Sequence, residues 1–237
     1  ARMGSMISMI AHQWRQPLTE LSGILMELET ATRFKKVNDN HILDSIEKSD
    51  KMIEFMSNTI DDFRNFYKPD KIKENFYISD SCKKAISLIS ASLEDSSIKL
   101  EFDINENRQT YGYPTEFSQV ILNLISNAKD ILVEKNIKNP KINLNIKAEG
   151  INSIITIKDN AGGVPDQIID KIFDSYFSTK EDSKGTGIGL YMSKQIIEDH
   201  MDGKITVQND HYVYQNENFT GAMFTIILPL SKKEEEY

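Results

Sequence analysis

The stretch Lys184-Gly185-Thr186-Gly187-Ile188-Gly189-Leu190-Tyr191 decides how the rest of the chain is interpreted. Its three glycines alternate with other residues, and apolar residues follow at positions 190, 192, 196 and 197, the spacing of an amphipathic helix. A glycine-rich loop that opens a helix can cradle a phosphate, because its backbone comes close to the anion and free N–H groups point at it. Glycine-rich turns are common and most bind no ligand, so the residues upstream must supply the specificity.

The composition is that of an ordinary globular protein with an acidic balance. The chain has 237 residues, of which 39% are hydrophobic and 27% charged, enough for one large domain or two small ones. A net charge of −8 argues against a nucleic-acid-binding surface, so no nucleic acid partner is expected. The single cysteine, Cys82, excludes an internal disulfide and a cysteine-based zinc site.

No apolar run in the sequence approaches the length of a membrane span, and no signal peptide is visible. The helical pattern has already begun by Met6, so we expect a fragment of a longer chain, with this part in the reducing cytoplasm. Contact with a membrane is expected only through a preceding N-terminal part, which could hold a sensor or anchor the full-length chain in the inner membrane.

The first seventy residues are predicted to form a helical hairpin. Residues 3–34 carry apolar positions that alternate in steps of four and three: Ile7, Ala11, Trp14, Leu18, Leu21, Leu25 and Leu28. A polar turn at 35–40 precedes a second helix over 41–67 with the same alternation. One hairpin cannot bury so wide an apolar stripe, so we predict that residues 1–70 pair with a second copy as a homodimeric four-helix bundle.

After a linker at Lys68-Pro69-Asp70-Lys71 the hydrophobic pattern changes. Strands are predicted near 76–78, 98–104, 141–147, 153–158, 203–208 and 222–228, and helices over 80–93, 114–135 and 187–200. Strands and helices are mixed without regular βαβ alternation. Residues 71–237 are therefore predicted to be an α+β domain with helices on one face of a mixed sheet.

The helix predicted over 114–135 carries a polar stripe on a face apart from its apolar core face. The stripe consists of Asn123, Asn127, Asp130 and Glu134, spaced four, three and four. Exposure to solvent is the simplest explanation of one such stripe. Asparagine is a poor helix former, however, and two amide oxygens four residues apart can ligate Mg2+ while nucleotide phosphates supply the charge.

The strand predicted over 153–158 ends in Asp159, which is followed by the small residues Asn160-Ala161-Gly162-Gly163. A carboxylate in such a place can accept a hydrogen bond from an exocyclic amine such as that of adenine. The alternative is that Asp159 only stabilises the turn. Three aromatic residues within 173–177 could anchor the base of a mobile lid, pack in the core, or do both.

Four of these segments, taken in sequence order, resemble the N, first glycine, phenylalanine and second glycine boxes of the ATP-binding domain of sensor histidine kinases. That domain is similar to those of gyrase, MutL and heat-shock chaperones. The boxes are Asn123…Asn127, Asp159-Asn160-Ala161-Gly162-Gly163, Phe173…Phe177 and Gly185-Thr186-Gly187-Ile188-Gly189-Leu190. The similarity runs from about 75 to 230 and ends in the strand at 221–229. Ala161 departs from the usual glycine, which is tolerable unless its backbone is left-handed.

Residues 10–18 resemble the H box of the same kinases, a histidine followed five residues later by proline and leucine. His12 lies off the apolar seam, where another domain could reach it. Pro17 removes a helical hydrogen bond at a cost of about 3 kcal/mol. Gln13 stands where many members have an acidic base, so the group that accepts the ring proton is open. Gln16 stands where many carry the threonine or asparagine used to dephosphorylate the partner, so phosphatase activity is open too.

The resemblance implies an ATP-dependent protein histidine kinase that autophosphorylates His12 and passes the phosphoryl group to an aspartate on the receiver domain of a response regulator. ATP and Mg2+ would bind with Asp159 on adenine and with Asn123 and Asn127 at the metal, Asn123 counting also as catalytic. The other implied nucleotide-binding residues, several in or near a lid over the γ-phosphate, are Asp130, Gly163, Lys180, Lys184, Gly185, Thr186, Gly187, Gly189 and Leu190.

Two other functional classes are compatible with these residues. One is a plain ATPase or chaperone-like switch in which His12 is incidental, and the pairing of His12 with Pro17 on a dimerisation hairpin disfavours it. The other is a scaffold that binds nucleotide without transferring phosphate, with Gln13 as a sign of lost activity. Nothing in the sequence excludes this scaffold.

Overall fold

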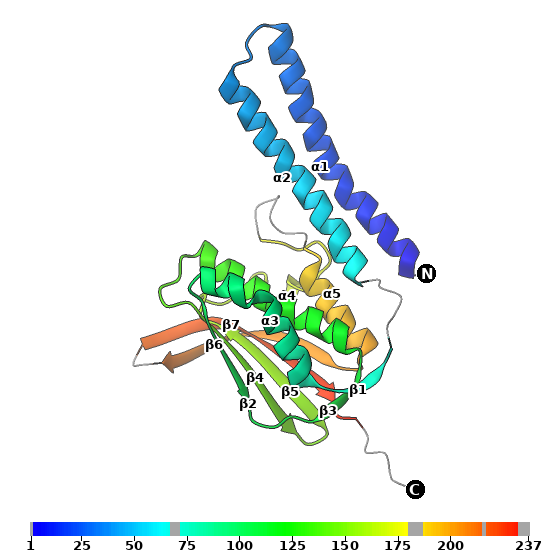
Figure 1. Ribbon diagram of the computed structural model, residues 1–237, viewed down its shortest axis with the longest axis vertical. Coiled ribbons are helices and arrows are strands. Elements are labelled where there is room, and N and C mark those ends of the chain that lie inside the picture. Colours follow the sequence, from blue (N-terminus) through cyan, green and yellow to red (C-terminus); the bar gives the residue numbers. More distant parts are fainter. Residues whose placement is uncertain (1, 67–71, 180–186, 215–216, 232–237) are drawn as a thin grey trace. The chain divides into compact units, whose positions relative to one another are not determined.

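The computed structural model describes residues 2–66, 72–179, 187–214 and 217–231. The chain divides into two compact units, one built on residues 1–69 and the other on residues 70–177 together with 187–237 (Figure 1). Each unit has its own architecture, and each is described by itself.

The first unit is a hairpin of two long helices, α1 (Arg2–Arg33) and α2 (Asp39–Phe66), which pack along each other. α1 runs without a break through Pro17 and ends where Lys35 adopts a left-handed backbone (φ 54°), with the Lys36 amide donating to the Ala31 carbonyl at 2.8 Å. Asn38 caps α2, because its side-chain oxygen accepts a 2.8 Å hydrogen bond from the amide of His41. The predicted hairpin is therefore closed by local helix-capping interactions.

The second unit is built on a five-stranded mixed sheet with the strand order β2-β4-β5-β7-β6. The strands are β2 (Lys99–Ile104), β4 (Lys141–Glu149), β5 (Asn152–Asp159), β6 (Lys204–Tyr214) and β7 (Glu217–Pro229). β2 pairs with β4 in parallel and every other pair in this sheet is antiparallel. A separate two-stranded ribbon pairs β1 (Glu74–Tyr77) with β3 (Gln109–Gly112). β3 was not predicted from the sequence, because four residues are too short for a clear alternation.

Three helices lie on one face of the five-stranded sheet, namely α3 (Ile78–Asp95), α4 (Pro114–Glu134) and α5 (Gly189–Gln195) (Figure 1). α5 continues into a π-helical turn, η2 (Ile196–His200), and a 3-10 turn, η1 (Ile169–Lys171), follows β5. The inward side of α4 is fully buried, as are the facing positions of β4 and β5: Phe117, Ile121, Leu124, Ile125, Ile142, Leu144, Ile146 and Ile155. The predicted α+β architecture is thus confirmed for this unit. Burial of each such side chain contributes about 1.5–3 kcal/mol to stability.

Among the described residues, no helix combines the length and the apolar character needed to cross a membrane.

Candidate functional site

The polar stripe of α4 faces the start of α5. The Asn123 side-chain amide donates a 2.9 Å hydrogen bond to the Ser193 hydroxyl, and that hydroxyl donates at 3.0 Å to the Gly189 carbonyl. Asn127 Nδ2 lies 3.5 Å from Asn123 Oδ1. Gly189 allows this approach, since a Cβ there would overlap Asn123 Oδ1. The structure therefore brings together the two asparagines and the last glycine of the predicted glycine-rich loop.

Asp159 ends β5 and is buried beneath the loop that follows it. Its Oδ1 atom accepts two backbone hydrogen bonds, from Ala161 at 2.8 Å and from Ala222 on β7 at 3.2 Å. Within the described part of the chain, no hydrogen bond engages Oδ2. Burial raises the pKa of the Asp159 carboxyl, and the two backbone hydrogen bonds and the charge of Lys135 partly oppose that rise. Asp159 thus shapes the turn through Oδ1, while Oδ2 is an acceptor atom that no described residue engages.

The loop after Asp159 turns sharply at Gly162 and Gly163, whose φ angles are +89° and +78°. Ala161 is not among the residues with a left-handed backbone, so its methyl group is tolerated where the histidine kinases have glycine. The side chain of Asn209 on β6 holds the loop through two hydrogen bonds of 2.7 Å, accepting from the Val164 amide and donating to the Val164 carbonyl. The left-handed backbone of Gly163 favours glycine there, and a Cβ at this position would also displace the Asn209 side chain.

The loop is tied down at two further points. Asn160 donates to the carbonyl of Asn139 at 3.0 Å and accepts from the amide of Lys141 at 2.8 Å. The Lys135 ammonium, at the end of α4, donates to the carbonyl of Ala161 at 2.8 Å. The segment around Asp159 is thus anchored to α4, β4 and β6 before any ligand binds, which reduces the ordering that binding would require.

The aromatic cluster before the glycine-rich loop is only partly covered, because Phe173 and Phe177 are half-buried and Tyr176 is 39% exposed. The ring of Phe173 meets Phe224 of β7 edge-on, with centroids 6.2 Å apart, and the Lys194 ammonium lies 5.7 Å from its centroid. Tyr176, with φ 70°, donates from its amide to the carbonyl of Gly187 at 3.1 Å. Tyr176 and Gly187, which are eleven positions apart in the sequence, are therefore joined by a backbone hydrogen bond.

Other predicted site residues differ in how far the structure describes them. Lys180, Lys184, Gly185 and Thr186 lie outside the described residues. Leu190 and Asp130 are partly exposed, on α5 and α4 respectively. His12 lies on α1, in the first unit, and only its backbone is described.

The oxygen donors at the α4–α5 site suit a hard cation. Carboxylate and amide oxygens are preferred by Mg2+, which usually keeps waters and phosphate oxygens as its other ligands. Asn123, Asn127 and Asp130 supply such oxygens on one face of α4, all partly exposed. Across the described ranges of the chain, no group of three or more His, Cys, Asp or Glu side chains is placed to hold a metal ion.

Ser193 and Asn209 form hydrogen bonds to residues of the candidate site, and neither was predicted from the sequence. Neither stands in a recognisable motif, and each acts on a residue far away in sequence. An asparagine inside a strand is unfavourable, so Asn209 gave a weak local signal. A serine within a helix, such as Ser193, gave none.

Comparison with known proteins places this architecture in a family. Residues 112–232 match the family model described as histidine kinase-, DNA gyrase B- and HSP90-like ATPase. The two-component sensor PprA of Pseudomonas aeruginosa is 26% identical over 99% of this chain and 25% of its own length. Sporulation kinase E of Bacillus subtilis is 27% identical over 99% of this chain and 29% of its own length. The sensor histidine kinase ZraS of Salmonella typhimurium is 27% identical over 99% of this chain and 47% of its own length. The chain thus spans between a quarter and about half of these relatives.

Solved structures show the same fold. The histidine kinase ThkA in complex with the response regulator protein TrrA has a TM-score of 0.64 and 21% identity, covering 98% of this chain and 63% of that chain. The nucleotide-free catalytic domain of ThkA has a TM-score of 0.56 and 24% identity, covering 67% of this chain and 96% of that chain. With the match over half of its length and the site built on α4, β5 and α5, the chain belongs to the family of histidine kinase-, DNA gyrase B- and HSP90-like ATPases.

Proposed function

We propose that this chain is the cytoplasmic catalytic part of a sensor histidine kinase, which autophosphorylates His12 and passes the phosphoryl group to an aspartate of a response regulator. The observation that carries the proposal is the pairing, in one chain, of an ATPase-family domain with a helical hairpin in which Pro17 follows His12 by five residues. The curated relatives named as two-component sensors and kinases support it.

Adenine would be recognised at Asp159. Its Oδ1 is engaged by two backbone amides, so the carboxylate is held in one orientation and Oδ2 can accept from the exocyclic amine of the base. Gly163 would line the same end of the nucleotide. A preformed and buried acceptor of this kind discriminates against a base with a carbonyl in place of the exocyclic amine. The carboxylate oxygen and the carbonyl oxygen would then face each other with no proton between them.

The phosphates of ATP would lie toward the α4–α5 end of the site, near Asn123, Asn127, Asp130, Gly187, Gly189 and Leu190, with Lys180, Lys184, Gly185 and Thr186 contributed by the lid. Asn123 and Asn127 would hold Mg2+ through their amide oxygens. When bound, the ion neutralises charge on the transferring phosphoryl group. The residues of this chain would then orient the nucleotide and exclude water.

His12 would be the acceptor of the phosphoryl group. A neutral imidazole has one nitrogen with a free lone pair, which forms the N–P bond as the bond between the γ-phosphorus and the β,γ-bridging oxygen breaks. ADP leaves with that bridging oxygen. Catalysis of this type consists mainly of positioning and charge stabilisation. Gln13 carries no base, so attack by the neutral ring is the route that fits this chain.

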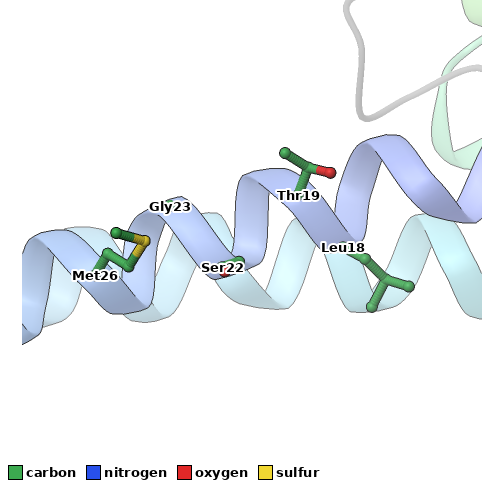
Figure 2. A pocket seen from close by; sticks show the side chains of 5 residues that line it. All are labelled: Leu18, Thr19, Ser22, Gly23 and Met26. Carbon is green, nitrogen blue, oxygen red and sulfur yellow. The ribbon is translucent and has the colours of Figure 1, made fainter.

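A homodimer would complete the first unit. The hairpin leaves large apolar side chains uncovered on both helices, namely Leu18, Leu25, Met26, Ile42, Leu43, Ile46 and Ile53. Figure 2 shows a hollow on α1 where Leu18 and Met26 flank the small residues Ser22 and Gly23. Exposed apolar surface on this scale is characteristic of an interface, and a hollow at small residues admits the side chains of a facing helix.

The partner that accepts the phosphoryl group would be a receiver domain of a response regulator. The solved complex of ThkA with the response regulator protein TrrA supports this class of partner. A membrane anchor, where present, would belong to a part of the protein outside this stretch, as part of a longer sensor.

Incubation of the protein with γ-labelled ATP and Mg2+ tests the proposal. We expect label on the protein that is lost in acid and retained in base, the behaviour of phosphorus on nitrogen. Nucleotide binding without label would favour the inactive scaffold. Release of labelled phosphate without labelled protein would favour the plain ATPase.

A further inference from the structure

Ser193 is a buried serine on α5, 2% exposed, that stands between two parts of the site. Its hydroxyl donates to the Gly189 carbonyl at 3.0 Å and therefore has no proton left for Asn123. The 2.9 Å contact between Ser193 Oγ and Asn123 must then have the amide nitrogen as donor. The hydroxyl thus fixes which end of the Asn123 amide faces α5.

The orientation of Asn123 passes on to Asn127. With its nitrogen on Ser193, Asn123 turns Oδ1 toward Asn127, whose Nδ2 lies 3.5 Å away. Gly189 leaves the space that Asn123 Oδ1 fills. The Oδ1 atom of Asn127 accepts no hydrogen bond from any residue that the structure describes. The three side chains therefore form a directed series, from the Gly189 carbonyl through Ser193 and Asn123 to Asn127, whose side-chain oxygen no described residue engages.

We propose that Ser193 is a positioning residue, which sets the amide orientation of Asn123 and, through it, the oxygen that Asn127 presents to Mg2+ in the Mg2+–nucleotide complex. The inference rests on the proposed function, which assigns the metal to these asparagines. The two ends of an amide are nearly equal in size, so shape alone cannot prevent a flip. Only the oxygen can ligate a cation, and a flipped amide would aim N–H protons at the metal.

Calorimetry on the full 237-residue chain with a β,γ-imido analogue of ATP tests the inference. Ser193→Ala should weaken binding in Mg2+ by about 3- to 10-fold, the effect of losing one neutral hydrogen bond. In excess EDTA the affinity should equal that of the parent. Ser193→Thr, which retains the hydroxyl, should restore the Mg2+-dependent part. An equal loss of affinity with and without Mg2+, or no loss in Mg2+, would overturn the proposal.

Ser118 offers a matched control. It is also buried, and its hydroxyl likewise donates to the carbonyl four residues earlier, that of Pro114, at 2.9 Å. Ser118 Oγ also lies 3.1 Å from the Ser81 carbonyl, so its single proton is shared between two backbone carbonyls and no site residue is involved. Ser118→Ala should therefore leave the Mg2+ dependence of binding as in the parent. If Ser118→Ala changed it as Ser193→Ala does, the effect would come from loosened helices and the proposal would fail.

A double-mutant cycle separates this inference from the proposed function. If Ser193 acts through Asn123, adding Ser193→Ala to Asn123→Ala should cause no further loss of affinity. Additive losses would overturn the inference alone. If Asn123→Ala and Asn127→Ala both left the Mg2+ dependence unchanged, the metal assignment of the proposed function would be wrong. NMR without nucleotide gives an independent check: Ser193→Ala should speed solvent exchange of the Asn123 Nδ2 protons, and unchanged exchange would contradict the inference.

Discussion

The side-chain amide of Asn209 pairs with the backbone of Val164 through two hydrogen bonds of 2.7 Å each, as a neighbouring strand would. Asn209 lies on β6 opposite Ala222 of β7, and the Ala222 amide donates to Asp159 of β5. Three adjacent strands thus hold the loop after Asp159 at both its ends. The sheet, together with the glycines of the loop itself, gives this part of the site its shape.

Asn209→Ala should loosen the loop after Asp159. Loss of two neutral hydrogen bonds should lower the free energy of unfolding by about 1–3 kcal/mol and weaken ATP binding, because the ligand must then order the loop itself. Urea unfolding and calorimetry measure the two effects. The neighbouring exposed Gln208 provides a control, since Gln208→Ala should change neither quantity. Unchanged ATP affinity in Asn209→Ala would show that the loop keeps its shape without the asparagine.

Asp159→Asn should separate binding from stability. The amide oxygen can still accept from Ala161 and Ala222, and the substitution removes a buried charge. We therefore expect thermal stability without nucleotide to be equal to or greater than that of the parent. ATP affinity should fall about tenfold or more, because the amide can present N–H protons to the amine of adenine. A lower melting temperature together with parental affinity would mean that Asp159 is only a turn residue.

ATP binding should depend on pH through Asp159. Burial raises the pKa of its carboxyl, so in the free protein the carboxyl takes up a proton at a higher pH than an ordinary aspartate does. As the pH falls through this raised pKa the acceptor is lost, and ATP affinity should decline. Calorimetry over a pH series checks this, and Asp159→Asn should lack the step. A step of equal size in that variant would assign the titration to another group, such as the nucleotide phosphates.

The raised pKa of Asp159 also determines how the free energy of unfolding changes with pH. The folded protein holds the Asp159 proton more tightly than the unfolded chain does, so the contribution to the free energy of unfolding is largest below the ordinary aspartate pKa. That contribution is lost as the pH rises through the raised pKa. At neutral pH the buried carboxylate therefore lowers stability, which explains why Asp159→Asn should not destabilise the free protein.

Ile53→Asp should separate the proposed dimer. Ile53 is 52% exposed on α2, and its substitution would place two like charges in the interface of a pair. Light scattering should then give half the mass of the parent. Leu88→Asp is the matched control, since Leu88 is 68% exposed on α3 in the other unit and should leave the mass unchanged. A parent chain that is monomeric at high micromolar concentration would refute the dimer.

Most of the fold could be predicted from periodic patterns. The helix around Leu124 and the strands around Leu144 and Ile155 bury one face each, and that regular burial is what a periodic sequence records. The helix around Leu21 shows the same periodicity, although its apolar side chains are only partly covered in the hairpin. The expected resemblance to histidine kinases, which rested on four motifs, is confirmed by the family match. β3 escaped prediction because its pairing with β1 is a long-range contact of four residues.

The site was predictable only where its residues form local motifs. Asn123, Asn127 and Asp159 stand in such motifs, and the structure gives each a hydrogen-bond partner within the second unit. Ser193 and Asn209 act on residues 70 and 45 positions away, which no local pattern records. Their part in the site follows from the packing of α5 on α4 and from the order of the strands. The roles of His12, of the two asparagines, of Asp159 and of the lid lysines in binding and catalysis all stay predictions.

His12→Ala tests the proposed kinase itself. His12 belongs to the first unit, whereas Asp159, Asn123 and Asn127 belong to the second, so loss of the imidazole should leave the nucleotide site intact. We expect ATP affinity within about twofold of the parent and no incorporation of γ-label. The label on the parent should be acid-labile and stable in base. His41→Ala is the control, since His41 is a partly exposed histidine on the other helix of the same hairpin.

Gln13→Glu in the same assay asks whether a base is missing. A carboxylate next to His12 could accept the remaining ring proton as the N–P bond forms, so faster labelling would show that proton removal limits the parent. An unchanged rate would show that attack by the neutral imidazole suffices. Label retained by His12→Ala would place the acceptor elsewhere. Hydrolysis of ATP by His12→Ala at the full rate of the parent, with neither protein labelled, would make the plain ATPase the better account of this chain.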